Sequence, residues 1–198
     1  MNNNYPLDVS LSNIWRSWYL FSQGKRKTRE LELFRYNLET NLFRLYTDIA
    51  NNRYKHGQYK VFIVCENKKR EIRVAPIRDR VVHRLLYNYL VDIYDASFIY
   101  DIWSCRANKG LIGAIKRAQK LLSRNPRGFV WRADIRKFFD NIDHQTLWRI
   151  IKRKITDKYA LRLLREVINS YSNVARSSLS LSLSLSRIAR AMGCQLAT

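Results

Sequence analysis

The amino-acid sequence predicts a mixed α+β domain, and three observations support this class. Apolar residues recur at steps of three or four in several long stretches, as they do in amphipathic helices. Two short β-prone runs flank a polar turn, which is typical of a β-hairpin. Hydrophobic residues make up 46% and aromatic residues 13% of the 198 residues, a composition too apolar for a disordered chain. We therefore expect a packed domain of helices around a short hairpin.

Helices are expected to fill most of the first 50 residues. The stretch IWRSWYLF, residues 14–21, predicts a first helix, and the basic turn QGKRK follows it. A longer helix should begin at Thr28, a suitable N-cap, and continue to Ile49. Its apolar residues form one helical stripe: Leu31, Phe34, Leu38, Leu42, Leu45 and Ile49. This stripe indicates core packing and not a binding site.

The two β-prone runs come next, as YKVFIV at residues 59–64 and REIRVAP at residues 70–76. The polar turn ENKK joins them, and Pro76 should end the second strand. This second strand is basic. We expect Arg70 and Arg73 to lie on one face of it, where they suit either phosphate binding or a solvated edge that discourages aggregation.

Helical spacing resumes after Pro76. From Ile77 the apolar residues fit one helix face, whereas Arg78, Arg80 and Arg84 occupy other faces. A further helix is expected over residues 111–122 and a short buried strand over residues 128–133. Asp143 is placed as the N-cap of the next helix, and two basic helices should continue to about residue 171.

The composition changes abruptly near residue 174. Residues 177–187 read SSLSLSLSLSR, and the sequence from Val174 onward contains neither an acid nor a lysine. This uniform repetition is unlike the varied residues that specify a packed core. We therefore divide the chain into a folded region, 1–173, and a low-complexity region, 174–198, which we expect to be a truncated or out-of-frame tail.

The charge balance predicts a polyanionic partner. Lysine and arginine number 37 against 16 acids, which gives a net charge of +21 and a pI near 10.3. Nucleic acid is the first candidate, because neutralising phosphates is the usual use of so many cations. Anionic membrane is the rival, but the sequence has no signal peptide and no run of about 18 apolar residues. We therefore expect a cytoplasmic protein without a membrane partner.

The stretch WRADIRKFFDNIDH gathers three aspartates in a basic neighbourhood. Asp134 follows the expected strand and is the one acid among ten lysines and arginines between Cys105 and Lys137. A carboxylate at a strand end beside many cations suits a divalent ion that bridges phosphate oxygens, although a turn or ion-pair role fits equally well. Asp140 fits an Asx turn, and Asp143 fits a helix cap. His83 and His144 show no ligand spacing and are assigned to packing or surface hydrogen bonds.

Three ordered blocks of the sequence resemble one protein family. KKREIRVAPIRDRVVH, SFIYDIWSCRANKG and FVWRADIRKFFDNIDH, in that order, are similar to the fingers and early palm of bacterial reverse transcriptases. The resemblance is to enzymes of the retron, group II intron and diversity-generating retroelement type, and it covers about residues 14–171. It implies the fingers and part of the palm of a right-hand polymerase, with an incomplete palm.

The resemblance also implies roles for individual residues. Asp134 would hold a catalytic Mg²⁺, with Mn²⁺ as an alternative, and Ile135 would offer its backbone carbonyl to the second metal. Phe139 would be the aromatic gate that selects deoxynucleotides. Arg70, with Lys68 and Lys69 as weaker candidates, would bind the nucleotide triphosphate. The implied contacts to the RNA template and DNA primer are Arg73, Arg78, Arg80, Arg106 and Lys109.

The sequence also departs from the family pattern. It contains no Gly-rich substrate block after these motifs and no adjacent pair of aspartates, so the Tyr-x-Asp-Asp turn of the family is missing. We therefore expect an RNA-directed DNA polymerase by family whose 198 residues do not polymerise alone. Two alternatives stay open: a non-catalytic nucleic-acid-binding module, and a Mg²⁺ nuclease that uses Asp134, Asp140 and Asp143. The oligomeric state is not predicted.

Overall fold

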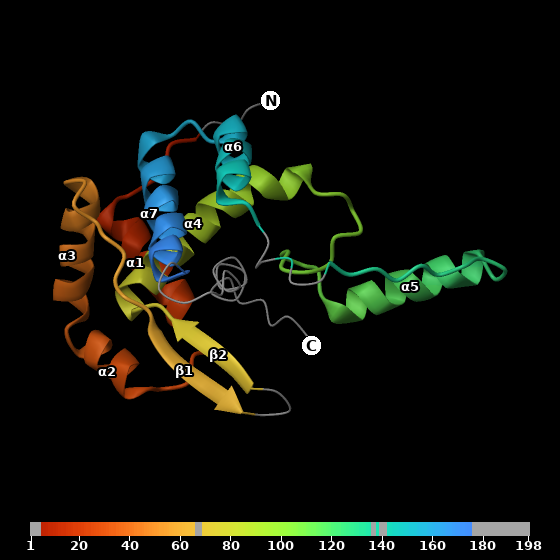
Figure 1. The fold of residues 1–198 in the computed structure, drawn as a ribbon, viewed down its shortest axis with the longest axis horizontal. Helices are drawn as coiled ribbons and strands as arrows, with labels where there is room; N and C mark the ends of the chain where they lie inside the picture. The colour runs from red at the N-terminus through yellow and green to blue at the C-terminus, as the bar shows by residue number, and fades with distance from the viewer. Residues whose placement is uncertain (1–4, 66–68, 136–137, 139–141, 176–198) are drawn as a thin grey trace.

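The computed structural model describes residues 5–65, 69–135, 138 and 142–175 of the chain. These residues form seven α-helices, one short 3₁₀ helix and a two-stranded antiparallel sheet (Figure 1). The expected mixed α+β class is confirmed at this level. The low-complexity repeat at residues 177–187 lies outside the described residues, and the last helix continues to Ala175, two residues past the expected boundary.

Helices α1 (Leu11–Ser22), α2 (Arg29–Tyr36) and α3 (Leu38–Ala50) form the N-terminal part. The expected cap at Thr28 is confirmed, because its side chain accepts a hydrogen bond from the backbone N–H of Leu31 at 3.3 Å. Such a cap satisfies one of the N–H groups that a helix start leaves without a partner.

The expectation of one long helix over this region is wrong, because the chain turns at Asn37. This residue adopts φ −108° and ψ 36°, outside helical values, and it separates α2 from α3. The side-chain amide of Asn41 donates a hydrogen bond to the carbonyl of Phe34 at 3.0 Å. This bond satisfies an acceptor at the end of α2 and so stabilises the break.

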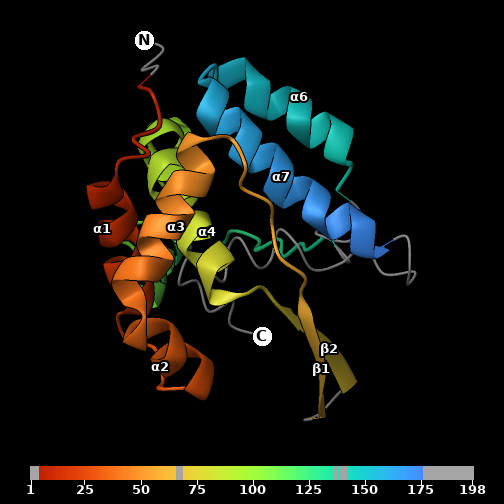
Figure 2. The same cartoon turned by 90° about the vertical axis from the view of Figure 1, so that its left-hand side faces the viewer.

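Strands β1 (Lys60–Cys65) and β2 (Lys69–Val74) form the expected hairpin. The register pairs Lys60 with Val74 and Cys65 with Lys69. Pro76 follows the second strand and serves as the N-cap residue of helix α4 (Ile77–Tyr94). The sheet projects from the helices with no further strand beside it in the described part of the chain (Figure 2).

Helix α4 is the centre of the fold. Helices α1, α2 and α3 pack on one side of it, and helices α6 (His144–Lys154) and α7 (Lys158–Ala175) lie on the other (Figure 2). Its residues Val81, Val82 and Leu85 are fully buried against side chains from both groups. Each such side chain contributes about 1.5–3 kcal/mol to folding by leaving water. The whole helical body therefore depends on α4.

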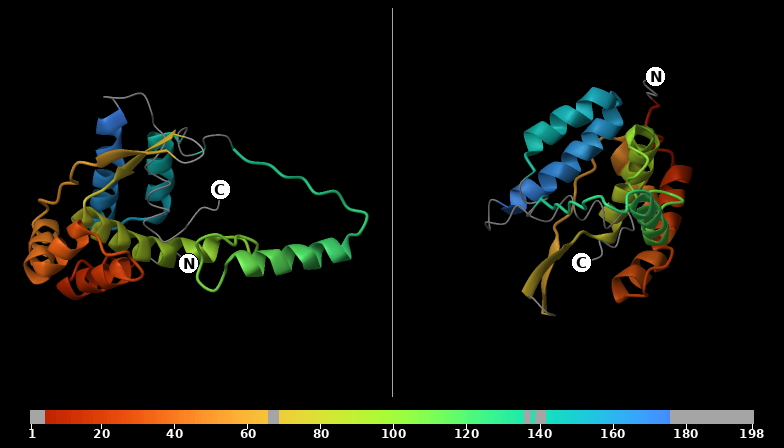
Figure 3. Two further views of the ribbon diagram at one scale, coloured as in Figure 1. Left: turned by 90° about the horizontal axis from the view of Figure 1, so that it is seen from below. Right: turned by 90° about the vertical axis from the view of Figure 1, so that its right-hand side faces the viewer.

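The C-terminal end of α4 leads into an arm. The short 3₁₀ helix η1 (Asp95–Ser97) is followed by a loop and then by helix α5 (Leu111–Arg124), which extends away from the body (Figures 1 and 3). Helix α5 occupies the expected residues but buries none of its side chains. The arm therefore adds little to the hydrophobic core.

The expected buried strand at residues 128–133 is wrong. The backbone there is irregular, and Trp131 is 89% exposed. A strand requires a neighbouring strand to satisfy its backbone groups and an apolar layer to cover its side chains. The described residues offer neither at this position, since the one sheet consists of β1 and β2. In the part of the chain that the structure describes, no helix is both long and apolar enough to cross a membrane.

Candidate nucleic-acid interface

The predicted metal ligand Asp134 lies exposed on the irregular segment that returns from α5. Ile135 beside it is exposed as well, whereas Phe139 and Asp140 lie outside the described residues. Among the described residues, no three histidine, cysteine or acidic side chains come together in a way that could hold a metal ion. Two-metal catalysis needs several carboxylates around the ions. Among the described residues, Asp134 therefore has no neighbouring group of metal-binding side chains.

The prediction that Asp143 caps a helix is confirmed. Its Oδ2 accepts a hydrogen bond from the backbone N–H of Thr146 at 2.7 Å at the start of α6. The hydrogen bonds from Thr146 hold the pKa of this carboxyl below its usual range, because they favour the ionised form. This geometry explains Asp143 without any catalytic role.

On the hairpin, the predicted cations divide between the two sides of β2. Lys68 lies outside the described residues, and Lys69 and Arg70 are placed by the backbone register, opposite Cys65 and Val64. The expectation that Arg70 and Arg73 share a face is wrong, because positions three apart on a regular strand lie on opposite faces. Arg73 is only 2% exposed, and its Nε donates to Glu71 Oε1 at 2.6 Å.

Arg78 is held by the protein itself. Its Nη2 donates to Asp48 Oδ2 at 2.7 Å and its Nη1 to the carbonyl of Lys55 at 3.1 Å. The guanidinium also lies over the ring of Tyr54, 4.9 Å from its centroid. These contacts connect the start of α4 to α3 and to the following loop. A contact with nucleic acid stays a prediction for this residue.

Arg106 and Lys109 stabilise the loop between α4 and α5. Arg106 donates to both carboxylate oxygens of Asp95, at 2.7 and 3.0 Å, and to the carbonyl of Ile99 at 3.1 Å. The ion pair holds the pKa of Asp95 below its usual range. Lys109 donates to the carbonyl of Tyr100 at 2.7 Å and stands over that ring. Both cations thus have a structural role, whatever else they contact.

Three cations that pair with no acid in the described part of the chain lie close together near Phe21, and we call them the Phe21 cluster: Lys25, Arg80 and Arg84. The Nζ of Lys25 lies 5.7 Å and the Cζ of Arg80 5.2 Å from the centroid of Phe21. Arg84 follows Arg80 by one turn of α4, so both lie on the same helix face. The Nε atoms of both arginines are buried and have no hydrogen-bond partner among the described residues.

The electrostatics of the Phe21 cluster favour an anion. Burial lowers the pKa of Lys25, and the positive charges of Arg80 and Arg84 lower it further. Burial also lowers the pKa of Arg80, partly offset by Glu30, which itself pairs with Lys60 at 3.3 Å. A bound phosphate would relieve the repulsion between these cations. Sequence analysis identified Arg80 but missed Lys25 and did not assign Arg84 to the site; the one available signal was the four-residue spacing of the two arginines.

A buried polar network behind the cluster was not foreseen either. His83 is not alone, because its Nε2 lies 3.2 Å from Nε2 of His56, and the two rings stack. The Nδ1 of His56 lies 2.7 Å from the carbonyl of Gly57, which can only accept. In the neutral pair, His56 therefore carries its hydrogen on Nδ1 and accepts at Nε2 from the Nε2–H of His83. Burial lowers the pKa of His83 to about 3, and His56 and Arg80 add to the effect.

This network makes stability depend on pH. The pKa of His83 is depressed in the folded protein to about 3, whereas an unfolded chain has a pKa near about 6.5. The contribution of neutral His83 to the free energy of unfolding is therefore complete above about pH 6.5. It is lost as the pH falls toward 3, because the unfolded state takes up the proton first. From pH 7.5 to pH 5 the loss should reach about 2 kcal/mol.

Urea unfolding at the two pH values measures this loss. His83→Gln keeps an amide donor near the position of Nε2 but does not titrate, so its loss of stability between pH 7.5 and pH 5 should be smaller by about 2 kcal/mol. Equal losses in the two proteins would contradict the assignment of the pH dependence to His83.

Comparison with known proteins gives a partial match to a curated protein. No family model matches the sequence. A stretch of 115 residues is 26% identical to Protein YkfC of Escherichia coli (strain K12), and the match covers 56% of this chain and 30% of that protein. The chain thus spans less than a third of the length of this curated relative.

Proposed function

We propose that the chain is the fingers and early palm portion of a bacterial reverse transcriptase, and that it binds the RNA template and DNA primer of such an enzyme. The observation that carries this proposal is the Phe21 cluster, where Lys25, Arg80 and Arg84 lie close together and the Nε atoms of both arginines are buried without a hydrogen-bond partner among the described residues. The three sequence blocks similar to retroelement reverse transcriptases support it, and so does the net charge of +21. A polyanion meets the requirements of this surface better than any neutral ligand.

Within this proposal, the polymerase chemistry requires more than the 198 residues contain. Asp134 would hold Mg²⁺, or Mn²⁺, together with carboxylates that this sequence does not supply, since it has no adjacent aspartates. Arg70 would bind the triphosphate of the incoming deoxynucleotide, and Phe139 would contact its sugar. The chain by itself would therefore bind nucleic acid without extending a primer.

Two other functions remain as alternatives. A non-catalytic nucleic-acid-binding module is favoured by the exposure of Asp134 and by the lack of a metal-binding group among the described residues. A Mg²⁺ nuclease using Asp134, Asp140 and Asp143 is disfavoured, because Asp143 already caps α6. The nuclease alternative requires cleavage that begins with Mg²⁺ and stops with a chelator.

A salt titration tests the proposal. Fluorescence anisotropy with a labelled RNA/DNA hybrid should give an affinity that falls steeply as salt rises, because each neutralised phosphate releases counterions. Arg80→Gln should weaken binding and lower the slope of log K against log salt by about 0.9. Arg44→Gln, at an exposed position of α3, is the matched control and should change neither quantity. An affinity that does not vary between low and physiological salt would exclude a phosphate-binding function.

A further inference from the structure

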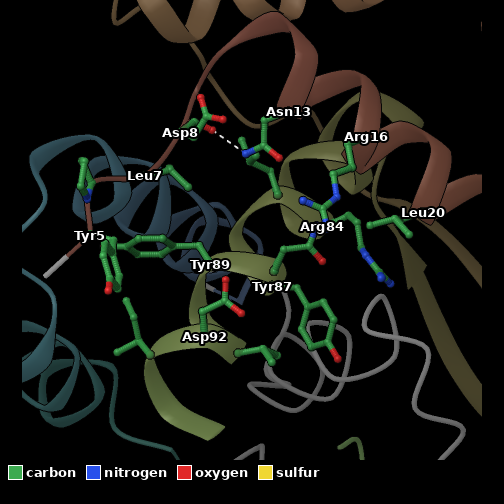
Figure 4. A pocket seen from close by; sticks show the side chains of 15 residues that line it. Tyr5, Leu7, Asp8, Asn13, Arg16, Leu20, Arg84, Tyr87, Tyr89 and Asp92 are labelled. Atoms are coloured by element: carbon green, nitrogen blue, oxygen red, sulfur yellow. Dashed lines mark hydrogen bonds between the residues drawn. The ribbon is translucent and has the colours of Figure 1, made fainter. Parts of the chain in front are cut away.

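A cavity of about 490 Å³ lies beside the Phe21 cluster, between the N-terminal segment, α1 and α4 (Figure 4). Arg84 belongs to both sites. The buried side chains of Leu7 and Leu85 form part of the cavity wall. The volume lies within the range of about 300–1,000 Å³ that is usual for small-ligand pockets.

The side chains of this cavity place two arginines at one end and Tyr5 at the other. Figure 4 shows Arg16 and Arg84 close together near Leu20, whereas Tyr5 lies across the pocket, with Asp92 between them. Tyr87 lies on the side of the arginines, and the guanidinium of Arg84 stands 5.0 Å from its ring centroid. The arrangement combines two cations with three tyrosine rings, because Tyr89 also lines the cavity.

Three polar side chains of the cavity are available for a ligand. In the described part of the chain, no hydrogen bond or ion pair engages the side chains of Arg16, Asn88 or Asp92, although all three line the cavity. Asn88 and Asp92 continue the four-residue spacing of Arg80 and Arg84 along α4. One helix face therefore presents first two cations, then an amide and a carboxylate.

We propose that this cavity binds one nucleotide of a single-stranded nucleic acid, with its phosphate at Arg16 and Arg84 and its base against Tyr5 and Tyr87. Guanidinium groups pair with phosphate oxygens, and aromatic rings stack with bases of any sequence. The Asn88 amide and the Asp92 carboxylate provide a donor and acceptors for the base edge or the sugar hydroxyls. This inference rests on the proposed nucleic-acid binding and extends it to a strand that passes from the Phe21 cluster into the cavity.

The test uses the whole chain and a fluorescein-labelled single-stranded RNA of about ten nucleotides, a length within the range that such grooves hold. Tyr87→Ala should lower the affinity at least about fivefold and leave the salt slope unchanged, because it removes stacking and no charge. Tyr5→Ala should act in the same direction, and since Tyr5 is exposed, this variant keeps the test valid if Tyr87→Ala unfolds the protein. Arg84→Gln should lower both the affinity and the salt slope, the latter by about 0.7.

Two matched controls separate the cavity from the surface at large. Tyr19→Ala changes an exposed tyrosine of α1 outside the cavity, and Arg44→Gln changes an exposed arginine of α3. Both should bind the RNA like the unaltered chain. Adenosine monophosphate tests whether the ligand is a free nucleotide or a strand. Competition with the RNA that is lost in Tyr87→Ala and Arg84→Gln would identify a free nucleotide as the ligand. No competition would identify the strand.

Three results decide the matter. Losses in the tyrosine variants with unchanged controls support the nucleotide site. Binding by Tyr5→Ala and folded Tyr87→Ala equal to that of the unaltered chain overturns it, and a salt-dependent affinity in the same experiment leaves the proposed function standing. If the unaltered chain binds neither this RNA nor the RNA/DNA hybrid, both proposals fail.

Discussion

Asp134→Asn should abolish primer extension in a protein that joins residues 1–173 to a palm with a Tyr-x-Asp-Asp turn. Asparagine has nearly the same shape but no charge, so it neither holds Mg²⁺ firmly nor aligns the attacking oxygen. The expected loss is at least about a thousandfold in the extension rate, equivalent to about 4 kcal/mol of transition-state stabilisation. Extension of a labelled primer on an RNA template measures it. Folding should be unaffected, because Asp134 is exposed.

Asp143→Asn is the matched control, since it makes the same chemical change nine positions later. Asparagine accepts the hydrogen bond from Thr146 about as well as aspartate, so only the interaction with the helix dipole, about 0.3–1 kcal/mol, is at risk. Most of the activity should remain. If Asp143→Asn abolishes activity in a folded protein while Asp134→Asn keeps it, the assignment of the metal ligand is reversed. That result would favour the arrangement of carboxylates in the nuclease alternative.

Asp79→Ala should destabilise the helical body by about 3–5 kcal/mol. Asp79 is 1% exposed; its Oδ1 accepts from the hydroxyl of Tyr54 at 2.8 Å and its Oδ2 from the N–H of Gly57 at 3.0 Å. Alanine would leave the buried hydroxyl of Tyr54 and the part-buried N–H of Gly57 without these partners. Burial is the largest of the causes that raise the pKa of Tyr54, and it remains when Asp79 is removed, so the hydroxyl cannot avoid this cost by ionising. Urea unfolding at neutral pH gives the change in free energy.

Asp92→Ala provides the comparison on the same helix. Its carboxylate is exposed and has no hydrogen-bond partner in the described part of the chain, so its removal should change the free energy of unfolding by less than about 0.5 kcal/mol. The loss of stability in Tyr54→Phe should lie between these two values, at about 1–2 kcal/mol, because this change removes one hydrogen bond and keeps the ring. Equal stability of Asp79→Ala and Asp92→Ala would show that the network contributes nothing to folding.

Features that depend on neighbouring residues could be predicted from the sequence. The caps at Thr28 and Asp143 were identified because a cap needs only the residues that follow it. The hairpin was identified because its two strands and its turn are contiguous. The break at Asn37 was missed, because the helical spacing of apolar residues continues through it. The hydrogen bond from Asn41 that stabilises the break leaves no recognisable pattern in the sequence.

Features that depend on distant residues could not be predicted. The strand expected at residues 128–133 had the right composition, but strand formation requires partners that the described sheet does not provide. His56 and His83 are 27 positions apart, and only the packing of the loop on α4 brings them together. The same holds for Lys25 at the Phe21 cluster, whereas Arg80 and Arg84 share one helix and a regular spacing.

The central place of α4 couples ligand affinity to the folding equilibrium. Arg80 and Arg84 project from the same helix whose other face carries Val81, Val82 and Leu85 in the core, so the cluster exists only while the body is folded. Any ligand held there is therefore linked to global unfolding, and a hundredfold excess over its dissociation constant adds about 2.7 kcal/mol. A ligand held by α5 alone would lack this linkage, because that helix buries no side chain. The melting temperature thus reports which part of the molecule holds the nucleic acid.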